Sequence, residues 1–325
     1  MTKLGYQIPN FTYPDVGPAQ LFDAIARQAR EADTSGFDTL LVMDHFYQLP
    51  MLGEPDRYML ESYTLLAALA RETSHVRLGA LVTGNTYRYP AVLAKTVTAL
   101  DIVSGGRAQL GIGAGWFELE HDSFGIPFGT FTDRFERLEE SLQIVLPMLT
   151  GERPTLEGKH YEVDRAMNEP PPIGRIPVMI GGAGEKKTLR MVAQYADESN
   201  LICAPEEVPG KLAALDAHCE RLGRDRSEIT VSWQRTACIA PTMEQARTEL
   251  DGYLTQRGFD IAALDEDTKA MLRARFIIGD PDTVGEQLAE NLALGVDGFT
   301  VNLPANGHIP ERVALLGETV APLVA

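Results

Sequence analysis

A glycine-rich stretch followed at once by aromatic and ionisable side chains is the clearest sign of chemistry in this chain. Residues 107–121 read RAQLGIGAGWFELEH, a short β-type run whose later positions include Gly111, Gly113 and Gly115. Backbone without side chains at a strand end allows a flat ligand to approach the main chain closely. The residues that would flank such a ligand and supply an aromatic wall and acid–base groups are Trp116, Glu118, Glu120 and His121. The alternative is an ordinary glycine-rich turn with a tryptophan in the core.

Three other predicted strand ends carry polar or glycine-rich segments. Asp44 and His45 follow the run 38–43, and a carboxylate beside an imidazole suits proton transfer near neutral pH. The segment 83–90 (TGNTYRYP) offers hydroxyl and amide groups and one arginine to a polar ligand. The segment 181–188 (GGAGEKKT) leads bare backbone into a predicted helix start, which favours an anion. Each of these segments is also compatible with an ordinary turn.

Several common kinds of site lack their residues. The six histidines form no HxH or HExxH pair, so we predict no metal site and disfavour a metal-dependent hydrolase; His121, His160 and His308 are expected in exposed loops. Residues 111–115 form GxGxG instead of the GxGxxG of dinucleotide-binding folds, and no GxSxG is present. Lys186 stands where a P-loop requires glycine, which excludes an NTPase of that class.

Composition narrows the possible partners. The 325 residues carry a formal net charge of −17, which disfavours nucleic acid and anionic membranes as partners. No window is apolar enough to span a membrane, and no secretory signal is apparent at the N-terminus. The three cysteines form no CxxC pair and are expected to be reduced thiols of a cytoplasmic protein. A small-molecule substrate therefore remains the favoured partner.

Apolar runs and helical periodicity alternate along the whole chain. The pattern predicts eight strands, at residues 3–8, 38–43, 76–82, 107–113, 177–180, 199–203, 229–239 and 298–303. It predicts helices at 18–32, 91–103, 131–149, 185–196, 206–222, 243–256 and 266–274, and another opened by a capping box at Thr283 and Glu286. No linker divides the chain, so we expect a single (β/α)8 TIM barrel over residues 1–325, with loop insertions at its C-terminal face. Trp233 is expected in the core.

Four segments together resemble the luciferase-like monooxygenase superfamily, and within it the F420-dependent oxidoreductases. They are LVMDHF (41–46), VRLGALVTGNTYRYPAVLAK (76–95), DIVSGGRAQLGIGAGWFELEH (101–121) and PVMIGGAGEKKTLRMVAQYAD (177–197). The resemblance covers essentially the whole chain. It implies a barrel that holds a deazaflavin (coenzyme F420) or a flavin at its C-terminal mouth, in a homodimer.

The resemblance also implies where the cofactor and substrate bind. His45, with Asp44 beside it, would lie against the ring or the substrate, and a non-proline cis peptide would fall near Leu81 and Val82. The remaining cofactor contacts implied by the resemblance are Thr83, Asn85, Gly113, Ala114 and Gly115. The cofactor phosphate would bind at Gly181, Gly182, Ala183 and Gly184, with backbone NH groups of 182–185 as donors. Because F420 carries an acidic tail, the basic residues Arg88, Lys95, Lys186 and Lys187 would have to offset the net charge of −17.

One departure from the family pattern concerns the substrate. Sugar-phosphate dehydrogenases of the family carry a glutamate where this chain has Trp116, which argues against that substrate class. The resemblance implies hydride transfer between C5 of F420 and a small organic substrate, with His45, Trp116 and Glu118 as the candidate catalytic residues. Two alternatives remain open: an FMN-dependent monooxygenase on the same fold, and a flavin- or deazaflavin-binding protein without turnover.

Overall fold

Eight parallel strands form a barrel in the computed structural model, which describes residues 3–325. Their order is β3-β2-β1-β12-β10-β9-β8-β5, and a parallel bridge between Leu78 and Ala108 joins β3 to β5 and closes the ring. The bounds of these strands are β1 Leu4–Ile8, β2 Thr39–Val42, β3 Arg77–Ala80, β5 Leu110–Gly113, β8 Val178–Gly181, β9 Glu198–Leu201, β10 Thr230–Ile239 and β12 Gly298–Asn302. The (β/α)8 barrel and all eight predicted strands are thereby confirmed.

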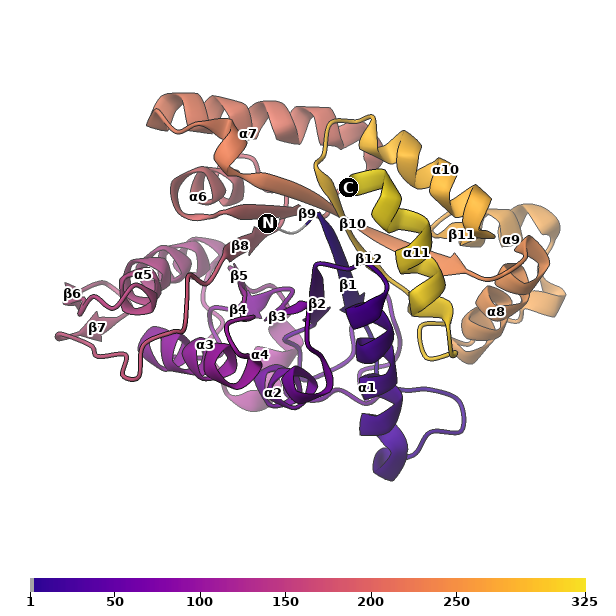
Figure 1. The fold of residues 1–325 in the computed structure, drawn as a ribbon, viewed down its shortest axis with the longest axis horizontal. Helices are drawn as coiled ribbons and strands as arrows, with labels where there is room; N and C mark the ends of the chain where they lie inside the picture. Colours follow the sequence, from indigo (N-terminus) through magenta and orange to yellow (C-terminus); the bar gives the residue numbers. More distant parts are fainter. Residues whose placement is uncertain (1–2) are drawn as a thin grey trace.

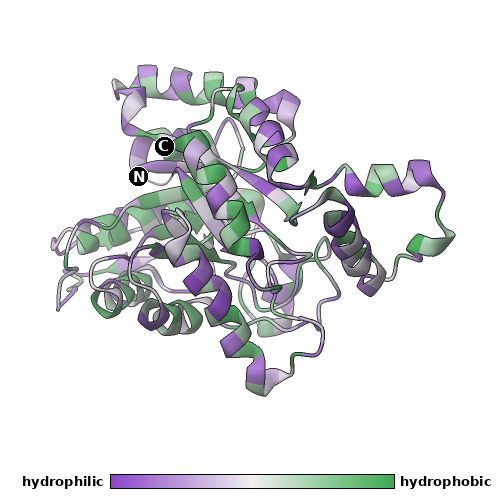
Figure 2. Cartoon of the chain, turned by 45° about the vertical axis from the view of Figure 1, so that its right-hand side comes forward, coloured by the Kyte–Doolittle hydropathy of each residue, from purple (hydrophilic) through white to green (hydrophobic). Residues whose placement is uncertain are grey.

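Helices surround the barrel and cover the outer faces of the strands (Figure 1). Their bounds are α1 Pro18–Thr34, α2 Ser62–Glu72, α3 Pro90–Ser104, α4 Glu118–Phe124, α5 Phe131–Leu149, α6 Thr188–Tyr195, α7 Val208–Leu222, α8 Met243–Gln256, α9 Glu266–Arg273, α10 Pro281–Leu292 and α11 Arg312–Val324. The layers are amphipathic, with hydrophobic faces directed at the barrel and polar faces outward (Figure 2). Trp233 is fully buried, as predicted.

Three short additions decorate the barrel. β4 (Thr83–Gly84) continues the chain beyond β3 and pairs with β5, and β11 (Ile277–Gly279) extends the sheet beside β10. The surface segment predicted at 150–175 forms a two-stranded hairpin, β6 (Leu156–Glu157) and β7 (Glu162–Val163). Figure 1 shows α8, α9 and β11 gathered on one side of the barrel and β6 and β7 at the opposite edge.

The predicted capping box at Thr283 is wrong. Helix α10 begins earlier, and Asp280 caps it by accepting a hydrogen bond from the Thr283 backbone NH at 3.0 Å. Pro281 at the first helical position has no NH to satisfy, which fits this earlier start. The sequence pattern also did not predict α2, α4, α11 or β11, and α6 begins three residues later than the predicted helix at 185. Within residues 3–325, no helix is long and apolar enough to cross a membrane.

Candidate active site

The C-terminal ends of the strands form one face of the barrel, here called the mouth. Asp44, directly after β2, is 2% exposed, and its carboxylate accepts two hydrogen bonds from the Arg88 guanidinium, at 2.7 and 2.9 Å. It also accepts from the Ser62 hydroxyl at 2.6 Å and from the Gly84 backbone NH at 3.1 Å. Ser62 belongs to α2 and Gly84 to β4, so Asp44 holds β2, β4 and α2 together.

His45 lies on a fully buried carboxylate. Its Nδ1 is 2.9 Å from Oε2 of Glu120, whose Oε1 accepts from the backbone NH of Tyr47 at 2.8 Å and from that of Phe46. Tyr87 donates its hydroxyl proton to the same carboxylate. Burial raises the pKa of Glu120, but the hydrogen bonds from His45, Tyr87 and the backbone outweigh burial, and the net pKa lies below the usual value. Glu120 is therefore an anion at neutral pH that fixes the His45 ring and favours a proton on Nδ1.

Two aromatic rings, those of Trp116 and Phe117, also contact the His45 ring. Trp116 and Phe117 stack on each other with ring centroids 5.1 Å apart, and both present themselves edge-on to the imidazole at 5.8 and 5.9 Å. Phe117 is buried, whereas Trp116 is 53% exposed. An indole in this position, open to solvent beside an imidazole, is suited to cover a planar ligand.

The peptide bond between Leu81 and Val82 is cis, as the resemblance implied. The Val82 side chain lies over the ends of β5 and β8. A Cβ added at Gly113 or at Gly181 would lie 2.8 Å from a Val82 methyl group, and one at Gly111 would meet the Ala80 carbonyl at 2.0 Å. These glycines are therefore required by the bulge that follows β3, and the space beside them is occupied by Val82.

The next two predicted contacts, Thr83 and Asn85, are held by a neighbouring helix and a neighbouring strand. Thr83 is fully buried, and its hydroxyl lies 2.7 Å from that of Tyr63. Asn85 donates from both its backbone NH, at 3.1 Å, and its side-chain amide, at 2.9 Å, to the Gly113 carbonyl. Its side-chain oxygen is buried and accepts no hydrogen bond from the described residues. That oxygen therefore remains available to accept a hydrogen bond from a ligand.

The glycine-rich loop after β8 leaves a helix start without a side-chain cap. Gly182 has φ +116, a conformation that favours glycine, and its NH donates to the Asn200 carbonyl at 2.9 Å. Ala183 is half-buried, Gly184 is exposed, and Lys187 precedes α6 without capping it. An uncapped helix start with neighbouring NH groups is suited to an anion such as a phosphate.

A cluster of three amides in the barrel interior was not singled out from the sequence. The Gln7 side-chain oxygen accepts from Gln234 at 2.7 Å and from Asn302 at 2.9 Å, and the Gln7 amide nitrogen donates to the Leu81 carbonyl at 3.3 Å. The side-chain oxygens of Gln234 and Asn302 are buried and accept no hydrogen bond from the described residues. Only the inward register of β1, β10 and β12 brings these residues together.

These orphaned oxygens test whether the mouth fits a flavin-type ring. Buried polar atoms need partners. The lactam edge of a deazaflavin or a flavin presents an N–H between two carbonyls, and the amide cluster has both free acceptors and amide donors. An apolar cluster adjoins these amides, where Leu41, Leu81 and Met179 pack together with Val82 beside them. An apolar floor with an amide edge therefore fits a flat heterocycle with one polar edge.

The structure separates the two predicted glutamates and corrects one histidine. Glu118 is exposed in the first turn of α4, whereas Glu120 is fully buried against His45. His121, expected in an exposed loop, is buried in α4, where its ring nitrogens lie 2.7 Å from the Thr86 hydroxyl and 2.8 Å from the Phe117 carbonyl. The spacing of 120 and 121 on a short helix after the strand could have indicated burial, but α4 itself was not predicted.

Two of the four basic residues expected to offset an acidic cofactor tail have other partners. Arg88 is bound by Asp44 and Glu61, and Lys95 donates to the Glu169 carbonyl. Lys187 lies over the rings of Phe131 and Phe135, at 5.1 and 5.2 Å. Lys186 is exposed beside the glycine-rich loop. Positive charge near that loop therefore comes from Lys186 and Lys187.

Comparison with known proteins gives one family match. The sequence profile of the family described as luciferase-like monooxygenase matches residues 2–298. A curated relative, the F420-dependent glucose-6-phosphate dehydrogenase of Nakamurella multipartita, is 29% identical, and the match covers 94% of this chain and 92% of the relative.

Solved structures share the fold at lower identity. The coenzyme F420-dependent tetrahydromethanopterin reductase of Methanopyrus kandleri superimposes with a TM-score of 0.75 at 22% identity, over 100% of this chain and 99% of that one. A monooxygenase of Streptomyces bottropensis gives a TM-score of 0.82 at 20% identity, over 99% and 100%.

Proposed function

Because the chain belongs to the luciferase-like monooxygenase family, we propose that it is an F420-dependent oxidoreductase acting on a small organic substrate. The observation that carries the proposal is His45, held at the mouth by the buried anion Glu120 and covered by Trp116. The F420-dependent relative, similar over nearly the whole chain, supports the choice of cofactor. Coenzyme F420, when bound, supplies a hydride donor or acceptor at C5 of its ring.

His45 is the residue placed to hold or move a proton. With a proton on Nδ1 shared with Glu120, its Nε2 is the ring atom left to accept a proton from a substrate hydroxyl, and in the reverse reaction the same atom, once protonated, would donate that proton to a substrate carbonyl. The carboxylate below stabilises the imidazolium that acceptance of a proton produces. Trp116 would cover one face of the substrate. Glu118 is exposed near Trp116 and makes no contact with His45 among the described residues, so its catalytic role stays a prediction.

The remaining residues would seat the cofactor. The amide cluster of Gln7, Gln234 and Asn302, with Asn85, would bind the polar edge of the ring, and the apolar wall with Val82 would support its face. Backbone NH groups of 183–185 would bind the phosphate, with Lys186 nearby, because the NH of Gly182 already donates to the Asn200 carbonyl. Trp116 at the position of the family glutamate favours a substrate other than a sugar phosphate.

The alternative is FMN with a monooxygenase reaction, which the fold of the Streptomyces monooxygenase keeps open. The two cofactors share ring shape and phosphate, so the residues above suit both. Titrating the purified protein with F420 and with FMN, and following fluorescence quenching, distinguishes them. We expect F420 to bind at least tenfold more tightly, and preferential binding of FMN would overturn the proposal.

The substitution His45→Ala tests the role of the imidazole. General acid–base groups typically contribute about 10²- to 10⁴-fold in rate, so turnover should fall within that range while the Kd for F420 changes little. The matched control is His75→Ala, an exposed histidine that precedes β3 at the opposite end of the barrel. Unchanged turnover in His45→Ala would remove this residue from the mechanism, and tight F420 binding without any turnover would identify a non-catalytic binding protein.

A further inference from the structure

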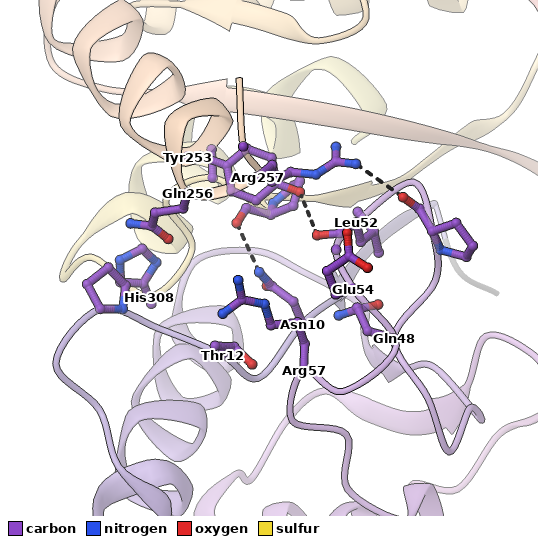
Figure 3. Close-up of a pocket in the computed structure, with 16 residues that line it drawn as sticks. Asn10, Thr12, Gln48, Leu52, Glu54, Arg57, Tyr253, Gln256, Arg257 and His308 are labelled. Atoms are coloured by element: carbon purple, nitrogen blue, oxygen red, sulfur yellow. Dashed lines mark hydrogen bonds between the residues drawn. The ribbon is translucent and has the colours of Figure 1, made fainter. Parts of the chain in front are cut away.

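A cavity lies at the loops that follow β1 and β12, and Figure 3 draws the residues that line it. Its volume is about 250 Å³, enough for a small organic molecule. It is enclosed by the loop after β1, the loop 48–57, the end of α8 and the loop after β12. None of the residues assigned above to the cofactor or to proton transfer lines it.

Two arginines line this cavity without a carboxylate partner in the described part of the chain. Arg57 is exposed, and within residues 3–325 its guanidinium has no hydrogen bond or ion pair. Arg257 donates from Nη2 to the Pro50 carbonyl at 3.2 Å and lies over the Tyr253 ring at 5.7 Å, but its Nε is buried without an acceptor. In a chain of net charge −17, guanidinium groups that stay free of carboxylates are available for an external anion.

Acidic side chains stand close to the two arginines of the cavity. Glu54 lines the cavity together with Arg57 and Arg257. Glu54 and Arg57 also line the adjoining hollow, where Asp15 and Asp56 stand. Burial lowers the pKa of His308, and Arg27 lowers it further, so this ring adds no positive charge at pH 7. These carboxylates repel a dianion more strongly than a ligand with a single negative charge, and a carboxylate carries one charge where a phosphate approaches two.

Three side-chain amides also belong to the lining, beside apolar residues such as Leu52 and Ala305. Asn10, Gln48 and Gln256 present amides to the cavity, and Asn10 and Gln48 are themselves held by the Pro304 and Pro9 carbonyls. Amide groups of this kind bind hydroxyl or carbonyl substituents. The lining thus combines guanidinium groups that can donate to a carboxylate with side-chain amides that can bind a hydroxyl or carbonyl group of the same molecule.

We propose that this cavity binds a small monocarboxylate that carries a hydroxyl or carbonyl group, with Arg57 and Arg257 as its carboxylate donors. The ligand would join the loop 48–57 to α8, which already meet where the Tyr253 hydroxyl donates to the Leu52 carbonyl at 3.3 Å. That loop begins three residues after His45. Binding at this site does not require the cofactor, so the proposal stands independently of the redox function.

The test is calorimetric titration of the purified chain, without cofactor, with lactate, with its neutral analogue lactamide, and with inorganic phosphate. We expect saturable binding of lactate, none of lactamide, and weaker binding of phosphate than of lactate. Arg57→Gln should weaken lactate binding at least about tenfold, because hydrogen bonds to a charged group contribute about 1.5–3 kcal/mol. Arg247→Gln removes the same charge from an exposed position on α8 and serves as the control.

Three outcomes would overturn the proposal. These are the absence of saturable lactate binding, equal binding in Arg57→Gln, or tighter binding of phosphate than of lactate. Arg57 is exposed, so its variant should remain folded, and a circular dichroism melt verifies this. Failure here while F420 binds would leave the proposed function intact, and lactate binding without any F420 affinity would leave only this site.

Discussion

The two sides of the barrel mouth differ in how their charges are satisfied. On the side of β2, β4 and α4, Asp44 and Glu120 are buried and each accepts several hydrogen bonds, and Arg88 is fixed between carboxylates. On the side of β1, β12 and α8, Arg57 has open space in front of it and Arg257 retains a buried donor without an acceptor. Charged groups that already have hydrogen-bond partners hold a site rigid before a ligand binds. Charged groups that lack partners beside a cavity indicate that a ligand supplies them.

The largest expected effect comes from removing a satisfied arginine. Arg88→Met leaves Asp44, 2% exposed, as an uncompensated buried charge, which typically costs about 3–5 kcal/mol. Arg57→Met removes the same group from the open side and should change the free energy of unfolding by no more than about 0.5 kcal/mol. Urea unfolding of the two variants measures this contrast. Equal losses would show that the two sides do not differ in the way their charges indicate.

A second prediction concerns packing on the satisfied side. Gly113→Ala places a Cβ 2.8 Å from a Val82 methyl group, and overpacking of this kind costs about 1–3 kcal/mol. Val82→Ala removes the methyl groups that the new Cβ meets. The double variant Val82→Ala with Gly113→Ala should therefore be little less stable than Val82→Ala alone. A double-mutant cycle in urea measures the coupling. Additive effects would mean that Gly113 is required for a reason other than Val82.

A third prediction uses the lowered pKa of Glu120. A carboxyl whose folded pKa lies below its unfolded value stabilises the fold above the unfolded pKa, and that contribution is lost as the pH falls through the folded pKa. Tyr87→Phe removes one hydrogen bond to Glu120 and raises its folded pKa, so at neutral pH the variant should be less stable by about 1–2 kcal/mol.

The difference between wild type and Tyr87→Phe should shrink as the pH is lowered below about 4, the usual range of a glutamate. Urea unfolding at several pH values measures it. Tyr89→Phe, on an exposed ring, provides the control and should show no such trend. A difference that stays constant with pH would show that the hydroxyl contributes through packing and not through the Glu120 charge.

The smallest effect on stability is expected at Trp116. Its ring is 53% exposed, so Trp116→Ala should cost less than about 1 kcal/mol of unfolding free energy. If the ring walls the substrate, the same variant should raise KM several-fold with little change in the Kd for F420. Steady-state kinetics and the cofactor titration measure the two quantities. A loss of cofactor affinity without a change in KM would place Trp116 against the cofactor instead.

The sequence predicted which strand ends carry the candidate site, and the structure shows partners for several of its side chains that the sequence did not indicate. The glycines at 113 and 181 were interpreted as space for a ligand, and the structure fills that space with Val82. Asp44 was grouped with the cofactor contacts and instead binds Arg88. Glu120 was seen as one of two similar acids, because nothing in the local pattern distinguishes it from Glu118. The distinction depends on α4, whose short helix turns one carboxylate inward and the other outward.

What the sequence determined by itself is the barrel, because alternation of buried strands and amphipathic helices is a local pattern that short segments carry independently. It also determined that polar and glycine-rich segments follow β2, β3, β5 and β8, and parallel strands bring those ends to one face. Only the tertiary structure decided which side chains meet across that face. Residues from distant segments meet in the pairing of His45 with Glu120, in the amide cluster, and in the two arginines that line the cavity. Contacts of that kind leave no periodic pattern in a single sequence. The amide cluster is Gln7, Gln234 and Asn302, and the arginines are Arg57 and Arg257.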